Sequence, residues 1–166
     1  MSWIRAVATF IASATVATAA PSAAQSSNTV AGTWRIVSAT VEADGKISYP
    51  YGEAPRGKLV FTDNLHFVEF MYDPEIPMVK SNERGRGTDE ENRTILGRSF
   101  ALYGRYTVDQ NGVFSGNVVE GSSFPNWVGD VRTTKELTMT VEGNRMTENF
   151  QRPGGAKVTI IWERYP

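Results

Sequence analysis

The chain has 166 residues, with 17 lysines and arginines against 18 aspartates and glutamates, one histidine and no cysteine. This near-neutral charge gives no electrostatic argument for nucleic acid or an anionic membrane surface as a partner. The lack of cysteine excludes disulfides, thiol nucleophiles and thiolate metal sites, so the core and the strand hydrogen bonds must stabilise the fold.

Residues 1–24 have the pattern of an export signal. Arg5 provides a positive start, residues 6–20 are apolar and rich in alanine, and Ser22-Ala23-Ala24 supplies small residues for cleavage. The apolar run is shorter than the roughly 20 residues that span a bilayer, so we expect no stable membrane insertion. We therefore predict a signal peptide over residues 1–24, one domain over residues 25–166, and a periplasmic or secreted location. An uncleaved tail is the alternative.

Short strands separated by turns dominate the rest of the chain. In residues 32–42 both faces mix apolar and polar side chains, which suits a barrel that holds a ligand inside and is partly covered outside. Asp44-Gly45 and Asn111-Gly112 are hairpin turn pairs. The pattern predicts an all-β fold, an eight-stranded antiparallel up-and-down barrel, which removes sheet edges by closing on itself. The eight strands are expected at residues 32–42, 58–62, 66–72, 103–109, 113–121, 131–141, 145–150 and 157–165.

One short helix is expected after the third of these strands. Thr88-Asp89-Glu90-Glu91 is a capping box, in which the Thr88 hydroxyl and the Glu91 carboxylate serve free backbone N–H groups. Leu96, Phe100 and Tyr103 follow at spacings of four and three. This spacing predicts a helix over residues 89–100 that lays one apolar stripe on the barrel.

Closure of the barrel requires the last strand to pair with the first. Gly32 leaves room for close backbone approach, and Trp34 can plug one barrel end if its indole N–H finds a partner. Arg164 is placed to lay its guanidinium over the Trp34 ring in a cation–π contact. The alternative is that Arg164 is a solvated strand end and Trp34 only a core residue.

Five segments in chain order resemble the calycin group, and most closely the lipocalin-like domain of bacterial and fungal proteins. The resemblance implies a small β-barrel whose interior accepts apolar or amphipathic molecules. Relatives often carry a histidine pair where this chain has Asn117 and Val118, which argues against imidazole chemistry in that strand. The segments are Gly-Thr-Trp-Arg-Ile-Val-Ser-Ala at 32–39, Tyr-Pro-Tyr-Gly at 49–52, Tyr-Gly-Arg-Tyr-Thr-Val-Asp at 103–109, Glu-Gly-Ser-Ser-Phe-Pro-Asn-Trp-Val-Gly at 120–129 and Thr-Ile-Ile-Trp-Glu-Arg at 159–164.

Two titratable residues are candidates for acid–base chemistry. His66 shares a strand face with apolar residues and would titrate near neutral pH, although a position beside the turn at the strand mouth is the simpler interpretation. Glu120 ends a strand that leads into an aromatic loop. A carboxylate inside the barrel would have a raised pKa, whereas an ion pair with a neighbour such as Arg132 would make Glu120 structural.

Aromatic residues supply candidate ligand contacts. Phe124 and Trp127 lie in a loop that is either a lid over the cavity or a packed corner of the barrel. Tyr72 and Tyr103 offer apolar bodies with polar tips, as a mostly apolar pocket requires. The candidate ligand-binding set is therefore His66, Tyr72, Tyr103, Glu120, Phe124 and Trp127.

The sequence points to no metal and no cofactor, because one histidine and scattered carboxylates do not form a ligand cluster. The leading prediction is an exported carrier of a small apolar or amphipathic molecule. The alternatives are a cyclase, isomerase or lyase using Glu120 or His66, and a solid barrel used only for interactions. A solid interior would favour the last, and two convergent titratable groups in a cavity would favour catalysis.

Overall fold

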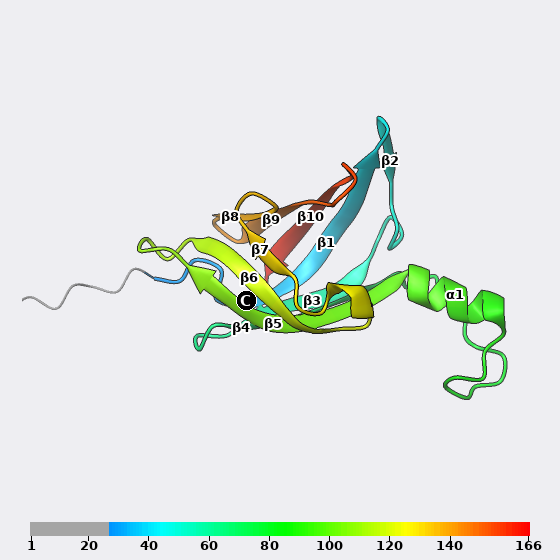
Figure 1. Cartoon of the computed structure of the whole chain (residues 1–166). Helices are drawn as coiled ribbons and strands as arrows, with labels where there is room; N and C mark the ends of the chain where they lie inside the picture. The colour runs from blue at the N-terminus through cyan, green and yellow to red at the C-terminus, as the bar shows by residue number, and fades with distance from the viewer. Residues whose placement is uncertain (1–26) are drawn as a thin grey trace, which may run out of the picture.

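The computed structural model describes residues 27–166, so the predicted signal peptide over residues 1–24 lies outside the described residues. The strands form one antiparallel sheet that curls into a nearly closed barrel, and a single α-helix stands apart from it (Figure 1). In chain order the elements are β1 (Gly32–Ala43), β2 (Lys46–Ser48), β3 (Arg56–Phe61), β4 (His66–Tyr72), α1 (Asp89–Gly97), β5 (Ser99–Val108), β6 (Phe114–Ser122), the 3₁₀ turn η1 (Pro125–Trp127), β7 (Val131–Thr133), β8 (Leu137–Glu142), β9 (Arg145–Gln151) and β10 (Lys157–Arg164).

The first and last strands are neighbours, as the sequence predicts. The order across the sheet is β7-β6-β5-β4-β3-β1-β10-β9-β8, with β2 paired to β1 as a short extra hairpin. Trp34 is opposite Arg164 and Ile36 is opposite Trp162 in the β1–β10 ladder. Strands next to each other in the chain pair antiparallel with two exceptions among the described residues: β3 pairs with β1 rather than with β2, and β7 and β8 form no ladder. The all-β antiparallel barrel is confirmed, with a gap between β7 and β8.

The strand count is ten rather than eight, and side-chain hydrogen bonds explain one of the two differences. The strand expected over residues 131–141 divides because Glu136 folds back on Thr133, whose backbone N–H and hydroxyl donate to Oε2 of Glu136 at 2.9 and 2.7 Å. The chain therefore leaves β6 after Thr133 and joins β9 from Leu137 onward. The other added strand is β2, which forms on the far side of the Asp44-Gly45 turn.

One end of the barrel is plugged by Trp34 and the chain that precedes it. The indole Nε1–H of Trp34 donates to the carbonyl of Val30 at 2.8 Å, and both residues are fully buried. Arg164 lies over the Trp34 ring at 4.0 Å and donates to the carbonyls of Thr29 and Ala31. A Cβ at Gly32 would lie 2.8 Å from Nη1 of Arg164, so a glycine makes room for this guanidinium. The cation–π contact expected from the sequence is thus present.

The helix begins as predicted but does not pack on the barrel. Thr88 and Glu91 form the reciprocal capping box. The helix ends at Gly97 rather than Phe100, it has no buried residue, and Leu96 is 60% exposed. Leu96, Phe100 and Tyr103 do not form the expected apolar stripe, because the strand β5 already starts at Ser99. In a strand successive side chains alternate between two faces, and this alternation turns Tyr103 outward.

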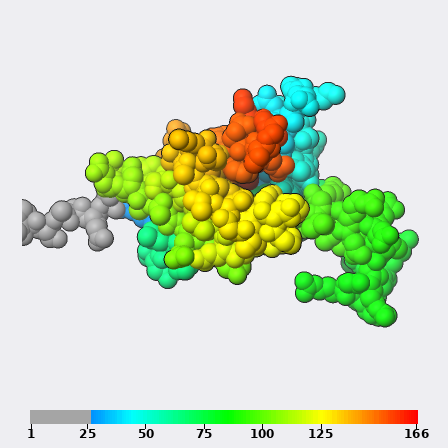
Figure 2. All heavy atoms as spheres, viewed as in Figure 1, coloured from blue at the N-terminus to red at the C-terminus, as the bar shows by residue number. Residues whose placement is uncertain are grey.

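The helix belongs to a long excursion that extends beyond the barrel (Figures 1 and 2). Its two ends are held together at the barrel edge. The backbone N–H of Asp73 donates to the carbonyl of Arg98 at 3.0 Å, and the fully buried Asp73 carboxylate forms an ion pair with the Arg98 side chain. The excursion is therefore fixed at its base.

We expect Arg164→Ala to lower the free energy of unfolding by about 3 kcal/mol, since it removes the cation–π contact and two charge-assisted hydrogen bonds. Urea denaturation measures this change. The matched control is Arg35→Ala, which breaks a surface ion pair with Glu163 and should cost less than about 1 kcal/mol. Equal losses in the two variants would show that Arg164 does not hold the barrel end.

Candidate functional site

The mostly apolar interior of the barrel contains a glutamate, because β4 turns the face that carries Glu69 inward. Phe67, Glu69 and Met71 are buried, whereas His66, Val68 and Phe70 are exposed. Pairing with β3 fixes this phase, since Phe61 is opposite Phe67 and Leu59 is opposite Glu69 in the ladder, and both β3 residues are buried. A glutamate is therefore carried into the core.

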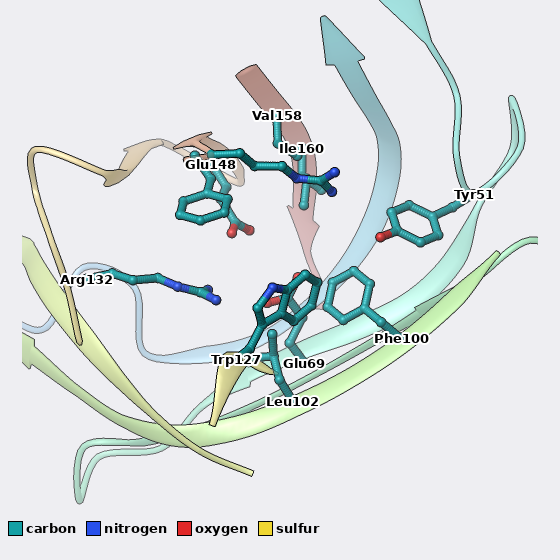
Figure 3. A pocket seen from close by; sticks show the side chains of 11 residues that line it. Tyr51, Glu69, Phe100, Leu102, Trp127, Arg132, Glu148, Val158 and Ile160 are labelled. Carbon is teal, nitrogen blue, oxygen red and sulfur yellow. The ribbon is translucent and has the colours of Figure 1, made fainter. Parts of the chain in front are cut away.

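Two further charged side chains reach the same space from other strands. Glu148 of β9 and Arg132 of β7 are 5% and 8% exposed, and Glu69 is 4% exposed. Figure 3 shows the Arg132 guanidinium and the Glu148 carboxylate pointing into one cavity above Glu69 and Leu102. We call Glu69, Arg132 and Glu148 the charged cluster.

The members of the charged cluster are fixed by aromatic neighbours. Trp162 donates its Nε1–H to Oε2 of Glu148 at 2.9 Å. The Arg132 guanidinium lies 4.6 Å from the centre of the Phe150 ring and 5.8 Å from that of Trp127. Oε1 of Glu69 and Nε of Arg132 are buried and make no hydrogen bond within the described part of the chain. The cluster thus contains two buried hydrogen-bonding atoms, on residues that line the cavity, that the described part of the protein does not satisfy.

Burial dominates the protonation of both carboxyl groups. Desolvation raises the pKa of Glu148 to about 7, although the Trp162 hydrogen bond and the charge of Arg132 act in the opposite direction. Desolvation and the neighbouring Glu148 raise the pKa of Glu69 well above its usual range. Both groups therefore keep a proton to higher pH than an exposed glutamate does, so Glu69 favours the form that donates a hydrogen bond, while Glu148 is close to its midpoint at neutral pH.

The free space has two adjoining parts. A cavity of about 30 Å³ lies against the charged cluster, which is room for little more than one water molecule. A hollow of about 500 Å³ lies at the barrel mouth, within the range of small-molecule sites. The two share five lining residues: Tyr51, Phe100, Trp127, Phe150 and Arg152. The barrel centre is thus almost filled by its own side chains, so the ligand predicted for the barrel interior has little room there, and the space for a ligand is at the mouth.

The wall of the mouth hollow consists largely of aromatic side chains, together with Arg152. Phe100 makes contacts with Tyr51 at 5.3 Å and with Trp127 at 5.6 Å between ring centres. Phe124 packs edge-on against Trp127 at 5.2 Å. Burial raises the pKa of Tyr51 to about 12 against the opposing charge of Arg152, so the phenol keeps its proton. This wall is apolar with two polar groups near the cavity.

The sequence-predicted acid–base residues lie outside the barrel. Glu120 is exposed and accepts a hydrogen bond from Nε of Arg105 on β5 at 2.6 Å, so it forms an ion pair, but not with Arg132. His66 is exposed at the start of β4, where its backbone N–H bonds to the Thr62 hydroxyl. Neither residue lines the cavity or the mouth hollow.

The predicted aromatic contacts divide between two surfaces. Phe124 and Trp127 line the mouth hollow, where Trp127 is both a packed residue and a wall. Tyr72 stacks on Phe70 at 5.5 Å beside a separate groove on the outer face, and Tyr103 is 52% exposed. The structure therefore brings together only two of the six predicted ligand-binding residues.

Sequence reasoning missed the charged cluster, although a signal for it exists. Glu69 alternates with Phe67 and Met71, and Glu148 alternates with Met146 and Phe150. A carboxylate in phase with large apolar residues indicates a charge on a buried face. Arg132 gives no comparable signal, because its strand has only three residues.

Within residues 27–166, no three histidine, aspartate or glutamate side chains are arranged to hold a metal ion. In the same part of the chain, no helix has the length and apolar character needed to cross a membrane.

Comparison with known proteins gives one family and one structure. A family model described as a lipocalin-like domain matches residues 31–165. No curated protein matches the chain. Among solved structures, a redesigned β-barrel is 14% identical over 86% of this chain and 96% of its own length, with a TM-score of 0.39. The family match includes every strand and the whole charged cluster.

We expect Glu148→Gln to flatten the dependence of stability on pH. A carboxyl group whose pKa is raised on folding stabilises fully below its unfolded pKa, near 4.5, and this stability is lost as pH rises through about 7. The wild type should therefore lose on the order of 3 kcal/mol relative to the variant between pH 4.5 and 8. Urea denaturation across this range measures the difference, with Glu163→Gln as the surface control. Parallel profiles for wild type and Glu148→Gln would contradict the raised pKa.

Proposed function

This chain belongs to the lipocalin-like domain family, and on that basis we propose that it binds a small amphipathic molecule at the mouth of its barrel. The observation that carries the proposal is the set of buried atoms on cavity-lining residues that lack a hydrogen-bond partner within residues 27–166: Oε1 of Glu69, Nε of Arg132 and Nε of Arg152. Such atoms are costly without a partner, because burial strips them of water. The polar end of a ligand would supply that partner.

The two volumes define how such a ligand would lie. A cavity of about 30 Å³ admits only the terminal atoms of a molecule, whereas the hollow of about 500 Å³ holds an apolar body. The ligand would therefore enter polar end first and rest against the packed rings of Phe100 and Trp127. Tyr51 and Arg152 would remain beside its middle.

The donors around the cavity favour an oxygen acceptor on the ligand. Nε of Arg132 always donates, and a protonated Glu69 donates as well. A carbonyl or hydroxyl oxygen suits two donors, while an ammonium group would meet the charges of Arg132 and Arg152. We infer that the ligand is a ketone, alcohol or acid with an aromatic or aliphatic body.

We further propose that the domain works after export, in the periplasm or outside the cell. Support comes from the leader pattern and from the first contacts of the fold. Asn28 donates to the Tyr106 hydroxyl at 2.6 Å and Thr29 bonds to the carbonyl of Gly112, so cleavage after residue 24 would remove neither contact. Intact-mass measurement of protein from the periplasmic and culture fractions should find a chain that begins at Gln25. A full-length chain confined to the cytoplasm would contradict this proposal.

For binding, we expect Trp127→Ala to weaken affinity about ten-fold, since it removes one wall of the mouth. Isothermal titration with 4-phenylbutan-2-one, 4-phenylbutan-2-ol and 4-phenylbutanoate measures this change. Native mass spectrometry of protein from its own host should also show a retained small molecule, which the variant loses.

The matched control is Phe70→Ala, which removes an exposed ring from the groove on the outer face. We expect its affinity to stay within about two-fold of the wild type. If none of the three compounds binds, or if Phe70→Ala is the variant that loses binding, the mouth is not the ligand site.

A further inference from the structure

The charged cluster contains more titratable groups than binding requires. One donor is enough to orient a ligand in an apolar pocket, yet this cavity holds two carboxyl groups. Within residues 27–166, no lysine or arginine nitrogen lies within 4.0 Å of either carboxylate, although Arg132 faces the same space. An ion pair that only braced the core would bring these charges together. The arrangement leaves both carboxyl groups available to a ligand.

We propose that the charged cluster catalyses proton transfer at a carbon atom next to the carbonyl group of a small ketone, with Glu148 as the base and with Glu69 and Arg132 holding the oxygen. This inference rests on the proposed function, because the ketone must first occupy the mouth. It replaces Glu120 and His66 as acid–base candidates by residues that line the cavity.

Glu148 is oriented for this role. Its Oε2 is held by the Trp162 indole N–H, and Trp162 is itself fully buried and fixed opposite Ile36. Because Oε2 is held by this hydrogen bond, the orientation of the whole carboxylate is fixed, and Oε1 is the oxygen left to accept a proton. With its pKa near 7, the carboxylate is populated at neutral pH and is basic enough to accept a proton.

Glu69 and Arg132 are suited to stabilise the charge that develops on oxygen. Both donors sit in a water-poor cavity, where fixed donors act most strongly on a forming oxyanion. A carboxyl group kept neutral by an apolar site is an established oxyanion donor in other enzymes. Arg132 is held between the Phe150 and Trp127 rings and so needs no rearrangement.

The step balances without a co-reactant. The C–H bond beside the carbonyl breaks, its electron pair forms a carbon–carbon double bond, and the carbonyl π pair moves to the oxygen. The proton resides on Glu148 and returns either to the same carbon or, when a β,γ double bond is present, to the γ carbon. The second outcome is a double-bond isomerisation.

The pH dependence has a defined sign. The rate should rise with pH as Glu148 ionises near pH 7, because only the carboxylate accepts the proton. Other groups around the pair are Arg132 from β7, Arg152 from the turn after β9, Tyr51 from the segment before β3 and Trp162 from β10. Tyr51 keeps its proton in this range, so the ionisation of the two coupled glutamates sets the profile.

The test is deuterium incorporation into 4-phenylbutan-2-one in D₂O buffer, followed by mass spectrometry. The wild type should exchange the protons next to the carbonyl at least about 100-fold faster than buffer, at a rate that rises through about pH 7. Glu148→Gln should abolish this rate while binding the ketone within about three-fold, because glutamine retains an oxygen for the Trp162 bond. Glu69→Gln should slow exchange, because it weakens the hydrogen bond to the developing oxyanion.

The control Glu163→Gln removes a carboxylate that faces outward on the neighbouring strand β10, and it should exchange at the wild-type rate. A ketone that binds but exchanges at the buffer rate would overturn the catalytic proposal and leave the binding proposal standing. Exchange by Glu148→Gln at the wild-type rate would also overturn it. Failure of the ketone, the alcohol and the acid to bind would instead overturn the proposed function, and this inference with it.

Discussion

The pairing of β1 with β10 is the constraint on which the rest of the structure depends. It places Trp34 beneath Arg164 and Trp162 beside Ile36, and it brings β9 round to the side of the barrel that faces β4. Glu148 and Glu69 are 79 positions apart in the chain and meet only because this ladder forms. Since strand pairing at such separation costs loop-closure entropy, the Arg164 contacts at the joint stabilise a pairing that the chain does not favour locally.

Burying three ionisable groups in a small barrel lowers the stability of the fold, and this loss of stability indicates that the groups have a role other than stabilising the core. A core of the same volume made from apolar side chains would usually be as stable or more stable. The protein instead keeps two carboxyl groups with raised pKa values and leaves one oxygen of Glu69 without a partner. Sites that trade stability for unsatisfied polar groups are commonly sites of binding or chemistry. The aromatic mouth above the cluster gives an apolar molecule access to these groups.

The site residues predicted from the sequence are separated from one another in the structure for two reasons. Strand alternation assigns side chains to two faces but does not say which face is inside. In β4 the face with His66, Val68, Phe70 and Tyr72 looked suitable for an interior, yet it is the outer one. In β6 a bulge beside Gly104 shifts the register after Tyr103, and Glu120 emerges outside next to Arg105. His66 and Glu120 lie on the outer faces of β4 and β6 and are therefore separated from the cavity.

The sequence by itself determined the fold class, the adjacency of the first and last strands, the Thr88 capping box and the contact of Arg164 with Trp34. The fold class and the capping box depend on local alternation and turn residues, which neighbouring residues encode. The two contacts between the chain ends follow from the closure that an up-and-down barrel requires. Only the tertiary structure decided which strand faces turn inward, where the 131–142 segment breaks, and that Glu69, Arg132 and Glu148 share one cavity. Those outcomes follow from register across non-local pairs, and a one-residue change of register exchanges the inside and outside of a strand.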